Sequence, residues 1–474
     1  MSRLPKPLKA TISFVIASTI TQGLTLLVTP LFVRIMSPEE IGIVTNFNSW
    51  TVLIGIIVNM VLYTNSYVIA ISEYPNQKYQ YTSCALFVSM ISASLFLLLY
   101  KIFPTMFENT FHLNTRLMYL MCIGFIFLPA TNFWLTLQRY EYKYISVLIV
   151  SVLSAVFAIG LSVSAVFYAR KSGISTAEAR LFGTYLVNVV IGVVFTVYIF
   201  SKGKKIWNKE FYKFILIVNT PMIVHSLSKN ILDVSDRVMI TALVGNAEAG
   251  IYGTLYSISM LIMIIWNAIN MGITPYMFSQ LNTIDECKES LKKFINILLK
   301  MFFIFSIVFV LVSPEIIKLF TSDDYVKSIN VVPPIISGCF ITAVYSLMGN
   351  VLLYNKKTVS VMKATVVASL VNVFLNRILI PVFGYHAAAY TTIAGYIVLC
   401  FSLYLSIRKI KNKTAEFFDF QFATRIIVCN LILSCIIIIL FPYPLIRYGI
   451  VMLIFLLIIH KRNMIFQIIT IIKK

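Results

Sequence analysis

The chain is a succession of long apolar segments separated by short polar breaks. About 20 apolar residues in a helix are enough to cross the hydrocarbon core of a bilayer. The segments are continuous and do not alternate in polarity, so they predict helices and not the strands of a barrel. We expect about fourteen spanning helices, over residues 11–33, 43–71, 81–103, 116–137, 145–168, 181–200, 214–243, 250–277, 294–313, 328–354, 359–381, 387–407, 421–441 and 443–460.

Composition supports the same class of protein. Charged residues make up 12% of the chain and hydrophobic residues 59%. A soluble domain carries roughly 25% charged residues. The sequence therefore predicts an all-α polytopic membrane protein.

The net charge of +21 follows the predicted topology. Most of the 39 Lys and Arg residues fall in alternate breaks, and cytoplasmic loops are the ones that carry such an excess. The densest basic breaks lie near residues 202–213, 288–293, 356–363 and 408–413. We therefore expect a multi-pass protein of the cytoplasmic (inner) membrane with both termini in the cytoplasm. Topology explains the charge without a nucleic-acid partner.

Two segments repeat along the chain. Residues 36–43 (MSPEEIGI) resemble residues 244–251 (VGNAEAGI), and residues 140–147 resemble residues 354–361. Each pair is separated by six predicted spans, so the two halves should have the same orientation and be related by a pseudo-two-fold axis along the membrane normal. We expect a six-helix lobe over residues 1–200, a basic cytoplasmic linker over 201–213, a second six-helix lobe over 214–412, and two extra helices with a basic tail over 413–474.

The seventh span concentrates the charges that lie within the membrane. His225, Lys229, Asp233 and Arg237 follow one another at four-residue steps, which places them on one face of a helix, and Asp236 lies beside them. Ionisable groups at this depth are costly and face protein or water. Two interpretations remain open: a salt-bridge ladder within the helix, or a cavity wall that binds an anionic head group or relays ions. Pro221 should kink this helix.

Other polar residues within the spans are fewer. Arg377 lies near Asn372 and Asn376, where packing and a cavity are both possible environments. Arg34 ends the first span and either reaches the cavity mouth or snorkels to the interface. Amides within spans usually bridge helices, and the chain has several: Gln22, Asn59, Asn188, Asn267 and Asn270.

No motif in the chain indicates catalysis. The loops are too short to hold a soluble catalytic domain, and no nucleotide-binding, zinc or nucleophile motif is present. The seven cysteines form no CxxC pair and mostly lie in apolar runs. We expect no catalytic residue, no metal, no cofactor and no nucleotide.

Several segments together resemble a known family of membrane proteins. They are residues 34–42, residues 138–144 (QRYEYKY), residues 235–240 followed by 248–252, and residues 375–381 with Gly384 and residues 387–389. The chain resembles the Wzx-type flippase branch of the multidrug/oligosaccharidyl-lipid/polysaccharide exporter (MOP) superfamily. Ala387 stands where that family commonly has Gly.

The resemblance implies a function. Such proteins move polyprenyl-diphosphate-linked oligosaccharides across the cytoplasmic membrane by alternating access, for O-antigen, capsule or related glycans. Lipid-linked oligosaccharide, membrane lipid and other polysaccharide assembly proteins would be the partners. The anionic head group would bind Lys229, Arg237, Arg377 and Arg34, because cation–phosphate hydrogen bonds are strong. Asp233, Asp236 and His225 would balance charge or couple an ion.

The sequence does not separate this cargo from another lipid-linked precursor, such as a peptidoglycan or teichuronic-acid unit. Two functions of other classes also stay open. A cation-coupled multidrug antiporter of the same superfamily would need buried carboxylates without cationic partners, whereas the candidate acids here alternate with Lys229 and Arg237. A membrane-embedded glycan polymerase would need catalytic groups on an outer loop, where only His112 and His386 are available as bases.

Overall fold

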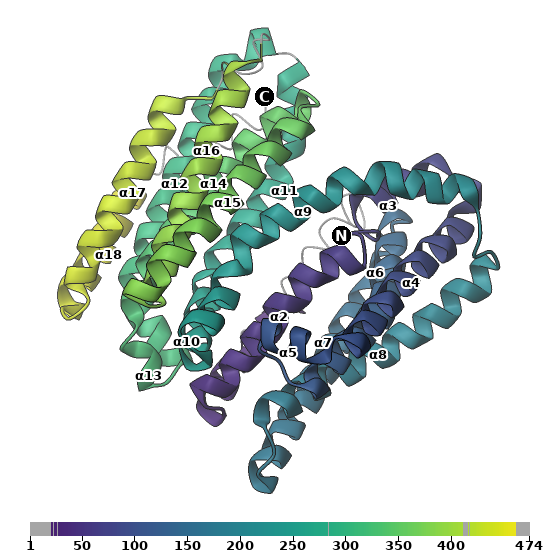
Figure 1. Cartoon of the computed structure of the whole chain (residues 1–474). Helices are drawn as coiled ribbons and strands as arrows, with labels where there is room; N and C mark the ends of the chain where they lie inside the picture. The colour runs from purple at the N-terminus through teal and green to yellow at the C-terminus, as the bar shows by residue number, and fades with distance from the viewer. Residues whose placement is uncertain are drawn as a thin grey trace. The chain divides into compact units, whose positions relative to one another are not determined.

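The computed structural model describes residues 20–21, 23–25, 27–282, 284–410, 416 and 418–460. This part of the chain is helical and has no β-strand (Figure 1). Twelve of its helices are long and apolar enough to span a membrane, and two shorter apolar helices cover Gly23–Ile35 and Pro444–His460. The predicted all-α polytopic class is confirmed. Both chain ends, and with them the expected cytoplasmic termini, lie outside the described residues.

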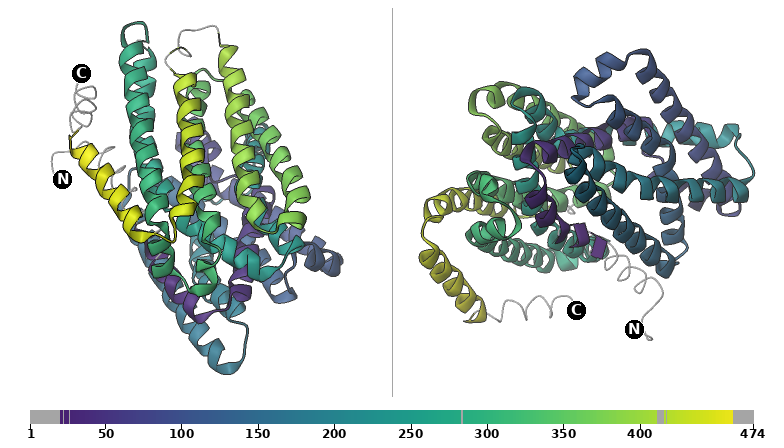
Figure 2. Two further views of the ribbon diagram at one scale, coloured as in Figure 1. Left: turned by 90° about the vertical axis from the view of Figure 1, so that its left-hand side faces the viewer. Right: turned by 90° about the horizontal axis from the view of Figure 1, so that it is seen from below.

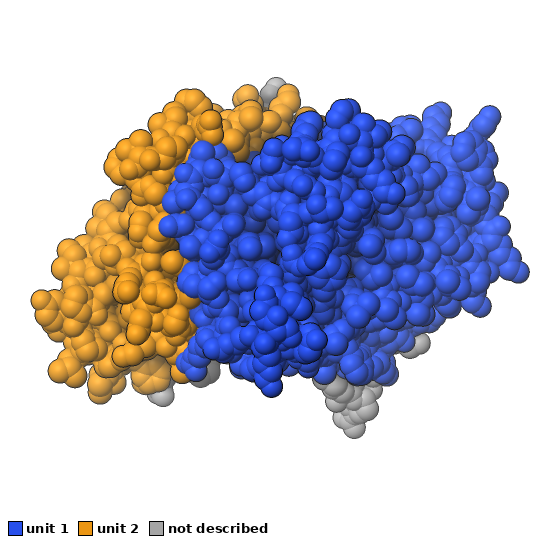
Figure 3. Space-filling view, turned by 60° about the horizontal axis from the view of Figure 1, so that its bottom comes forward, with its two compact units in different colours: residues 1–250 blue, residues 251–474 orange. Residues whose placement is uncertain are grey.

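The chain divides into two compact units, residues 1–250 and 251–474 (Figure 3). The helices of unit 1 are α2 (Pro38–Val58), α3 (Asn65–Glu73), η1 (Pro75–Gln77), α4 (Lys78–Ile102), α5 (Pro104–Phe111), α6 (Thr115–Tyr140), α7 (Tyr144–Ser172), α8 (Thr176–Gly203) and α9 (Lys209–Leu243). Helix α10 (Asn246–Ser259) crosses the boundary between the units.

Unit 2 continues with a bundle of long helices that run side by side in both Figure 1 and Figure 2. They are α11 (Leu261–Asn282), α12 (Ile284–Phe320), α13 (Asp323–Val326), η2 (Ile329–Val331), α14 (Val332–Tyr354), α15 (Thr358–Phe383), α16 (His386–Arg408), α17 (Phe420–Leu440) and α18 (Pro444–His460). Because α9 packs along α2 and α4, unit 1 extends past the basic linker. The lobe boundaries expected at residues 201–213 stay a prediction.

The predicted span over residues 43–71 is not one helix. Helix α2 ends at Val58, and α3 starts at Asn65 after a turn in which Met60 and Val61 have φ values of 52° and 55°. Backbone that leaves a helix at membrane depth must find partners in the protein. Here the Thr136 hydroxyl donates to the Tyr63 carbonyl oxygen at 3.0 Å. The continuous helix was a wrong prediction, because hydropathy does not detect a break that is satisfied by neighbouring helices.

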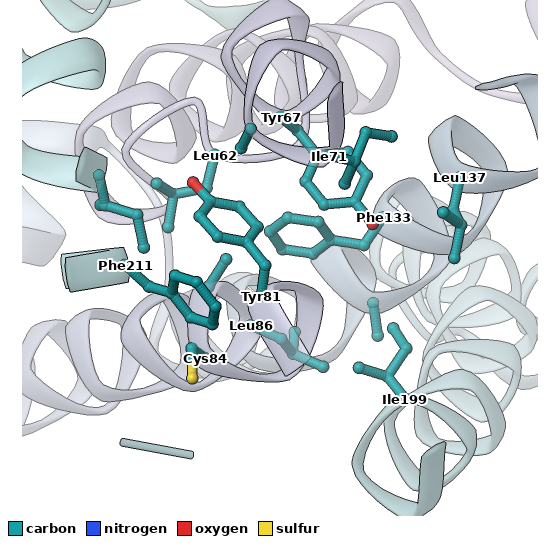
Figure 4. Close-up of a cluster of buried hydrophobic side chains, with 14 residues drawn as sticks. Leu62, Tyr67, Ile71, Tyr81, Cys84, Leu86, Phe133, Leu137, Ile199 and Phe211 are labelled. Atoms are coloured by element: carbon teal, nitrogen blue, oxygen red, sulfur yellow. The ribbon is translucent and has the colours of Figure 1, made fainter. Parts of the chain in front are cut away.

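Aromatic side chains hold the short helix α3 in the core of unit 1. Figure 4 shows Tyr67 of α3 beside Phe133 of α6, and their ring centroids are 5.1 Å apart. Tyr81 of α4 packs edge-on against Phe211 of α9 at 5.3 Å. All four side chains are almost completely buried. This cluster joins α3, α4, α6 and α9 into one unit and fixes the start of α9, the helix with most of the charged candidates.

Helix α9 is a single helix of 35 residues with Pro221 inside it. At about 1.5 Å per residue it is longer than the roughly 30 Å hydrocarbon core of a bilayer. Figure 1 shows that it is strongly bent. A proline removes one hydrogen bond of the helix and favours such a bend, in agreement with the kink expected from the sequence.

Candidate functional site

The charged side chains of α9 form a half-buried stripe. His225, Lys229, Asp233 and Arg237 are all intermediate in exposure, whereas Val224 on another face is 43% exposed. Lys229 and Asp233, four residues apart, form an ion pair with side-chain exposures of 25% and 29%. This ion pair is compatible with both interpretations of the stripe. A salt-bridge ladder is made of such pairs, and in a cavity wall the pair would neutralise both charges when no ligand is bound. The pair therefore confirms the shared helix face without choosing a role for it.

Asp236 is the most deeply buried charged group of α9. It is 1% exposed, and its carboxylate accepts a hydrogen bond of 2.8 Å from the backbone N–H of Arg237. Its neighbour Ser235 is also buried. Burying a carboxylate is costly in free energy unless it has hydrogen-bond or ionic partners. The burial of Asp236 therefore depends on the groups that surround it in the fold.

The candidates from the other spans lie elsewhere in the chain. Arg34 is exposed at the end of the helix over residues 27–35 in unit 1, and Arg377 is exposed on α15 in unit 2. Thus the structure brings together the α9 candidates, while Arg377 belongs to the other compact unit.

Behind Arg377, the amides of Asn372 and Asn376 are completely buried. Asn376 donates to the Asn372 side-chain oxygen at 3.2 Å, and the hydroxyl of Thr391 on α16 donates to Asn376. Thr392 lies 3.5 Å from the Asn372 amide nitrogen. The two amides therefore join α15 to α16, which favours the packing environment for this pair.

A second amide network in unit 2 includes residues that the sequence did not single out. The Asn350 amide of α14 donates to the Asn270 side-chain oxygen at 3.3 Å and to the Thr274 hydroxyl at 3.1 Å. In unit 1, Asn59, the residue that follows α2, likewise accepts a hydrogen bond of 3.0 Å from Ser89 of α4. The amides Asn59 and Asn270 bridge helices as predicted. Asn350 could have been identified from the sequence only as a polar residue inside an apolar segment.

The segment MSPEEIGI occupies the start of α2 and binds a second helix. Ser37 caps α2 by accepting the N–H of Glu40 at 3.2 Å. The Glu40 carboxylate in turn accepts the Ser175 hydroxyl at 3.0 Å and the backbone N–H groups of Thr176 and Ala177. These N–H groups belong to the first turn of α8, where an anion is favourable. Glu40 therefore ties α2 to α8.

The two copies of this repeated segment contact each other reciprocally. A methyl group on Gly42 would lie 1.7 Å from the Asn246 carbonyl oxygen, and one on Gly250 would lie 2.1 Å from the Pro38 carbonyl oxygen. In the repeat, Gly42 corresponds to Gly250 and Pro38 to Asn246. Across a two-fold axis, if residue i contacts residue j, then the counterpart of i contacts the counterpart of j. The two glycine contacts follow this pattern. The contact thus supports the pseudo-two-fold relation of the repeated segments.

The segment QRYEYKY forms the turn between α6 and α7. Glu141 pairs with Lys78 at the start of α4 and with Lys143, whose ammonium nitrogen is 2.6 Å from the carboxylate. Burial opposes the charged form of Glu141, but the two ammonium groups outweigh this effect and lower the pKa of the carboxyl group. The same contact raises the pKa of Lys143. This network joins two breaks that we predict to be cytoplasmic.

Breaks predicted on the same side of the membrane also meet in unit 2. Lys292 lies 3.4 Å from Asp419, and both belong to predicted cytoplasmic breaks. The hydroxyl group of Tyr385, in a predicted outer break, lies 2.6 Å from that of Ser328, at the predicted outer end of the span over 328–354. These contacts fit the alternation of the spans within the unit. Which side faces the cytoplasm stays a prediction.

Among the described residues, no group of three His, Cys, Asp or Glu side chains is arranged to hold a metal ion. All seven cysteines are free thiols.

Comparison with known proteins identifies the family. The family model described as polysaccharide biosynthesis protein matches residues 8–282, and the MatE model matches residues 221–378. No curated protein matches the chain.

Among solved structures, the lipid II flippase MurJ in an inward closed conformation is similar, with a TM-score of 0.72 and 16% identity over 96% of this chain and 100% of that chain. An inward-facing multidrug resistance MATE transporter of the MOP superfamily has a TM-score of 0.58 and 15% identity over 83% of this chain and 97% of that chain. A MOP superfamily transporter from Pyrococcus furiosus has a TM-score of 0.56 and 15% identity over 84% of this chain and 95% of that chain. The chain therefore belongs to the polysaccharide biosynthesis protein family, and its fold is that of these transporter structures.

Proposed function

We propose that the protein is a Wzx-type flippase that translocates a polyprenyl-diphosphate-linked oligosaccharide across the cytoplasmic membrane by alternating access, for the synthesis of O-antigen, capsule or a related surface glycan. The half-buried stripe of α9 carries the proposal. A diphosphate-linked glycan cannot cross hydrocarbon, so its carrier needs cations that water can reach at membrane depth. Lys229 and Arg237 are half-buried cations on α9, one of the helices that are long and apolar enough to span a membrane.

In this mechanism, Lys229, Arg237, Arg377 and Arg34 bind the diphosphate or acidic sugars. Asp233 holds the Lys229 ammonium group while the site is empty, and the head group replaces it on binding. Asp236 and His225 balance the remaining charge or couple an ion. The proposal draws support from the similar structure that is named as a lipid II flippase.

Loss of the gene tests the function directly. In a deletion strain, lipid-linked units should accumulate on the inner leaflet, because translocation is the missing step. Accumulation on the outer leaflet would instead indicate a polymerase. The leaflet can be determined with a membrane-impermeant glycan-modifying reagent before and after permeabilisation.

A double variant separates the two interpretations of the α9 stripe. Lys229→Ala should abolish export, since the head group loses a cation. If Lys229 served only to neutralise Asp233, the double variant Lys229→Ala/Asp233→Ala would restore export, because no charge would be left unpaired. We expect the double variant to stay inactive at equal membrane expression, and restored export would contradict the assignment. Lys101→Ala, an exposed lysine outside the proposed site, is the matched control.

The remaining cations are tested one at a time. Arg237→Ala, Arg377→Ala and Arg34→Ala should each reduce export. Full export by all three, together with full export by Lys229→Ala, would remove this set of residues from the proposed site.

The second candidate function is a cation-coupled drug antiporter. It is favoured by the MatE match over residues 221–378, which includes the whole α9 stripe. Under this alternative, the deletion strain would become drug-sensitive while its surface glycan stayed intact.

A further inference from the structure

Helices α15 and α16 line an open basic pocket of about 430 Å³ at one end of unit 2. The start of α15 and the end of α16 form its two walls, and the break before α15 contributes to its rim. Its lining residues are Lys357, Ser360, Lys363, Ala364, Val367, Ser402, Leu405, Ser406, Lys409 and Ile410. The pocket thus has three ammonium groups and three hydroxyl groups in a small space, next to apolar side chains.

The charges of the pocket are not neutralised by any carboxylate among the described residues. Lys357, Lys363 and Lys409 are exposed, and none of them pairs with a carboxylate of a described residue. Ser360 and Ser402 likewise make no side-chain hydrogen bond within the described part of the chain. Three unpaired cations around a concave surface repel one another, so an anion in the pocket would relieve that repulsion.

The first turn of α15 adds to the same potential. Lys357 is the N-cap residue of α15, and no side chain caps the helix there. The N-terminus of a helix carries a partial positive charge and N–H groups without partners. Since α16 ends at the same pocket and its C-terminus carries the opposite partial charge, the three ammonium groups are the main source of anion affinity.

An exposed apolar stripe leads away from the charged end. From Lys363 the same face of α15 continues through Val367, Leu370, Phe374 and Ile378, which are 47%, 65%, 64% and 47% exposed. On α16, Leu405 is 44% exposed. A ligand that places an anion among the lysines can therefore lay a long apolar chain along α15. That shape fits an amphiphile and not a free ion.

We propose that this pocket binds the phosphate head group of an anionic phospholipid, with an acyl chain along the exposed face of α15. Both walls lie at the ends of spans that we predict to face the cytoplasm, and the cytoplasmic leaflet is rich in anionic lipid. Basic pockets between membrane helices at this level bind such head groups. The site is separate from the α9 stripe and does not depend on the proposed substrate.

Binding to the purified full-length protein tests the site. The probes are short-chain phosphatidylglycerol, phosphatidylcholine of the same chain length, inorganic phosphate, and polyprenyl diphosphate without sugar. We expect phosphatidylglycerol to bind in preference to the other three. The triple variant Lys357→Gln/Lys363→Gln/Lys409→Gln should bind it about 100-fold more weakly, at about fivefold per lysine.

Two further variants make the result specific. Lys202→Gln/Lys209→Gln/Lys213→Gln removes three exposed lysines from the basic break of unit 1 and should leave binding unchanged. Lys357→Arg/Lys363→Arg/Lys409→Arg keeps the charge and should retain binding, which guards against misfolding of the first variant.

Each other outcome overturns the proposal. Equal binding of phosphatidylcholine would mean that the pocket does not select negative charge. Equal binding of inorganic phosphate would mean that no acyl chain is recognised. Stronger binding of polyprenyl diphosphate would make the glycan carrier the ligand, and equal losses in both glutamine variants would reduce the effect to net charge.

Discussion

At the scale of single residues, Glu141 has a role that its sequence context did not reveal. It joins the turn between α6 and α7 to the start of α4 through Lys78 and Lys143. Because the folded protein lowers the pKa of Glu141, this carboxylate stabilises the fold above its unfolded pKa of about 4.3. The stabilisation is lost as the pH falls through the lower folded pKa.

We therefore expect Glu141→Gln to lower the melting temperature of the purified protein at about pH 7, with a difference that shrinks toward about pH 3. Thermal unfolding across this range measures it. Glu39→Gln changes an exposed glutamate and is the control. A difference that does not depend on pH would assign the effect of Glu141 to packing and not to charge.

A second ion pair anchors α18, the last helix among the described residues. Arg447 of α18, which is 2% exposed, donates two hydrogen bonds of 2.8 and 2.7 Å to Glu315 of α12 and one of 2.6 Å to the Leu311 carbonyl oxygen. Glu315→Ala would leave the buried guanidinium group without its carboxylate, which costs about 3 kcal/mol.

We expect Glu315→Ala to lower the melting temperature more than Glu315→Leu/Arg447→Leu does, because replacing both charges by apolar groups leaves none uncompensated. Thermal unfolding in detergent makes the comparison. If the double variant were the less stable of the two, the pair itself, and not the avoidance of a buried charge, would account for the stability.

At the scale of elements, the contact between the two repeated segments depends on glycine. The backbones at Gly42 and Gly250 approach so closely that a methyl group at either position would overlap a carbonyl oxygen of the other segment. Backbone atoms cannot move aside as the end of a flexible side chain can, so the two segments would have to separate.

We expect Gly42→Ala and Gly250→Ala each to lower the melting temperature and to reduce export in the deletion strain. Gly160→Ala and Gly349→Ala are matched controls within helices, since a methyl group at those positions would meet nothing within 4 Å. A Gly42→Ala variant with the melting temperature and export of the natural protein would show that the contact is not needed.

The elements also show where sequence reasoning succeeds and where it stops. Hydropathy located the spanning segments because each one must bury its own backbone hydrogen bonds in lipid. It missed the break between α2 and α3, because the partners that make the break possible, Ser89 and Thr136, come from α4 and α6. The four-residue spacing placed Lys229 and Asp233 on one face, and the structure confirms their pairing. The same spacing could not show that Asp236 is the buried acid, since burial depends on neighbouring helices.

At the scale of the whole molecule, the repeats and the alternating charges give one consistent topology. Contacts within each unit join breaks that we predict on the same side of the membrane, such as Lys292 with Asp419. These contacts establish which breaks share a side but not which side is cytoplasmic. The positive-inside rule supplies that direction, and it predicts that the lysine-rich ends face the cytoplasm.

Cysteine labelling of intact cells decides the orientation. All seven native cysteines are free, so they are first replaced to give a silent background. Single cysteines at the exposed positions Asn109 and Asp324, in predicted outer breaks, should react with a membrane-impermeant maleimide in whole cells. Cysteines at Lys202 and Lys356 should react only after permeabilisation. The reverse pattern would invert the protein and place the basic pocket of α15 and α16 on the outer leaflet, whereas labelling of one site from each pair would contradict the alternation of the spans.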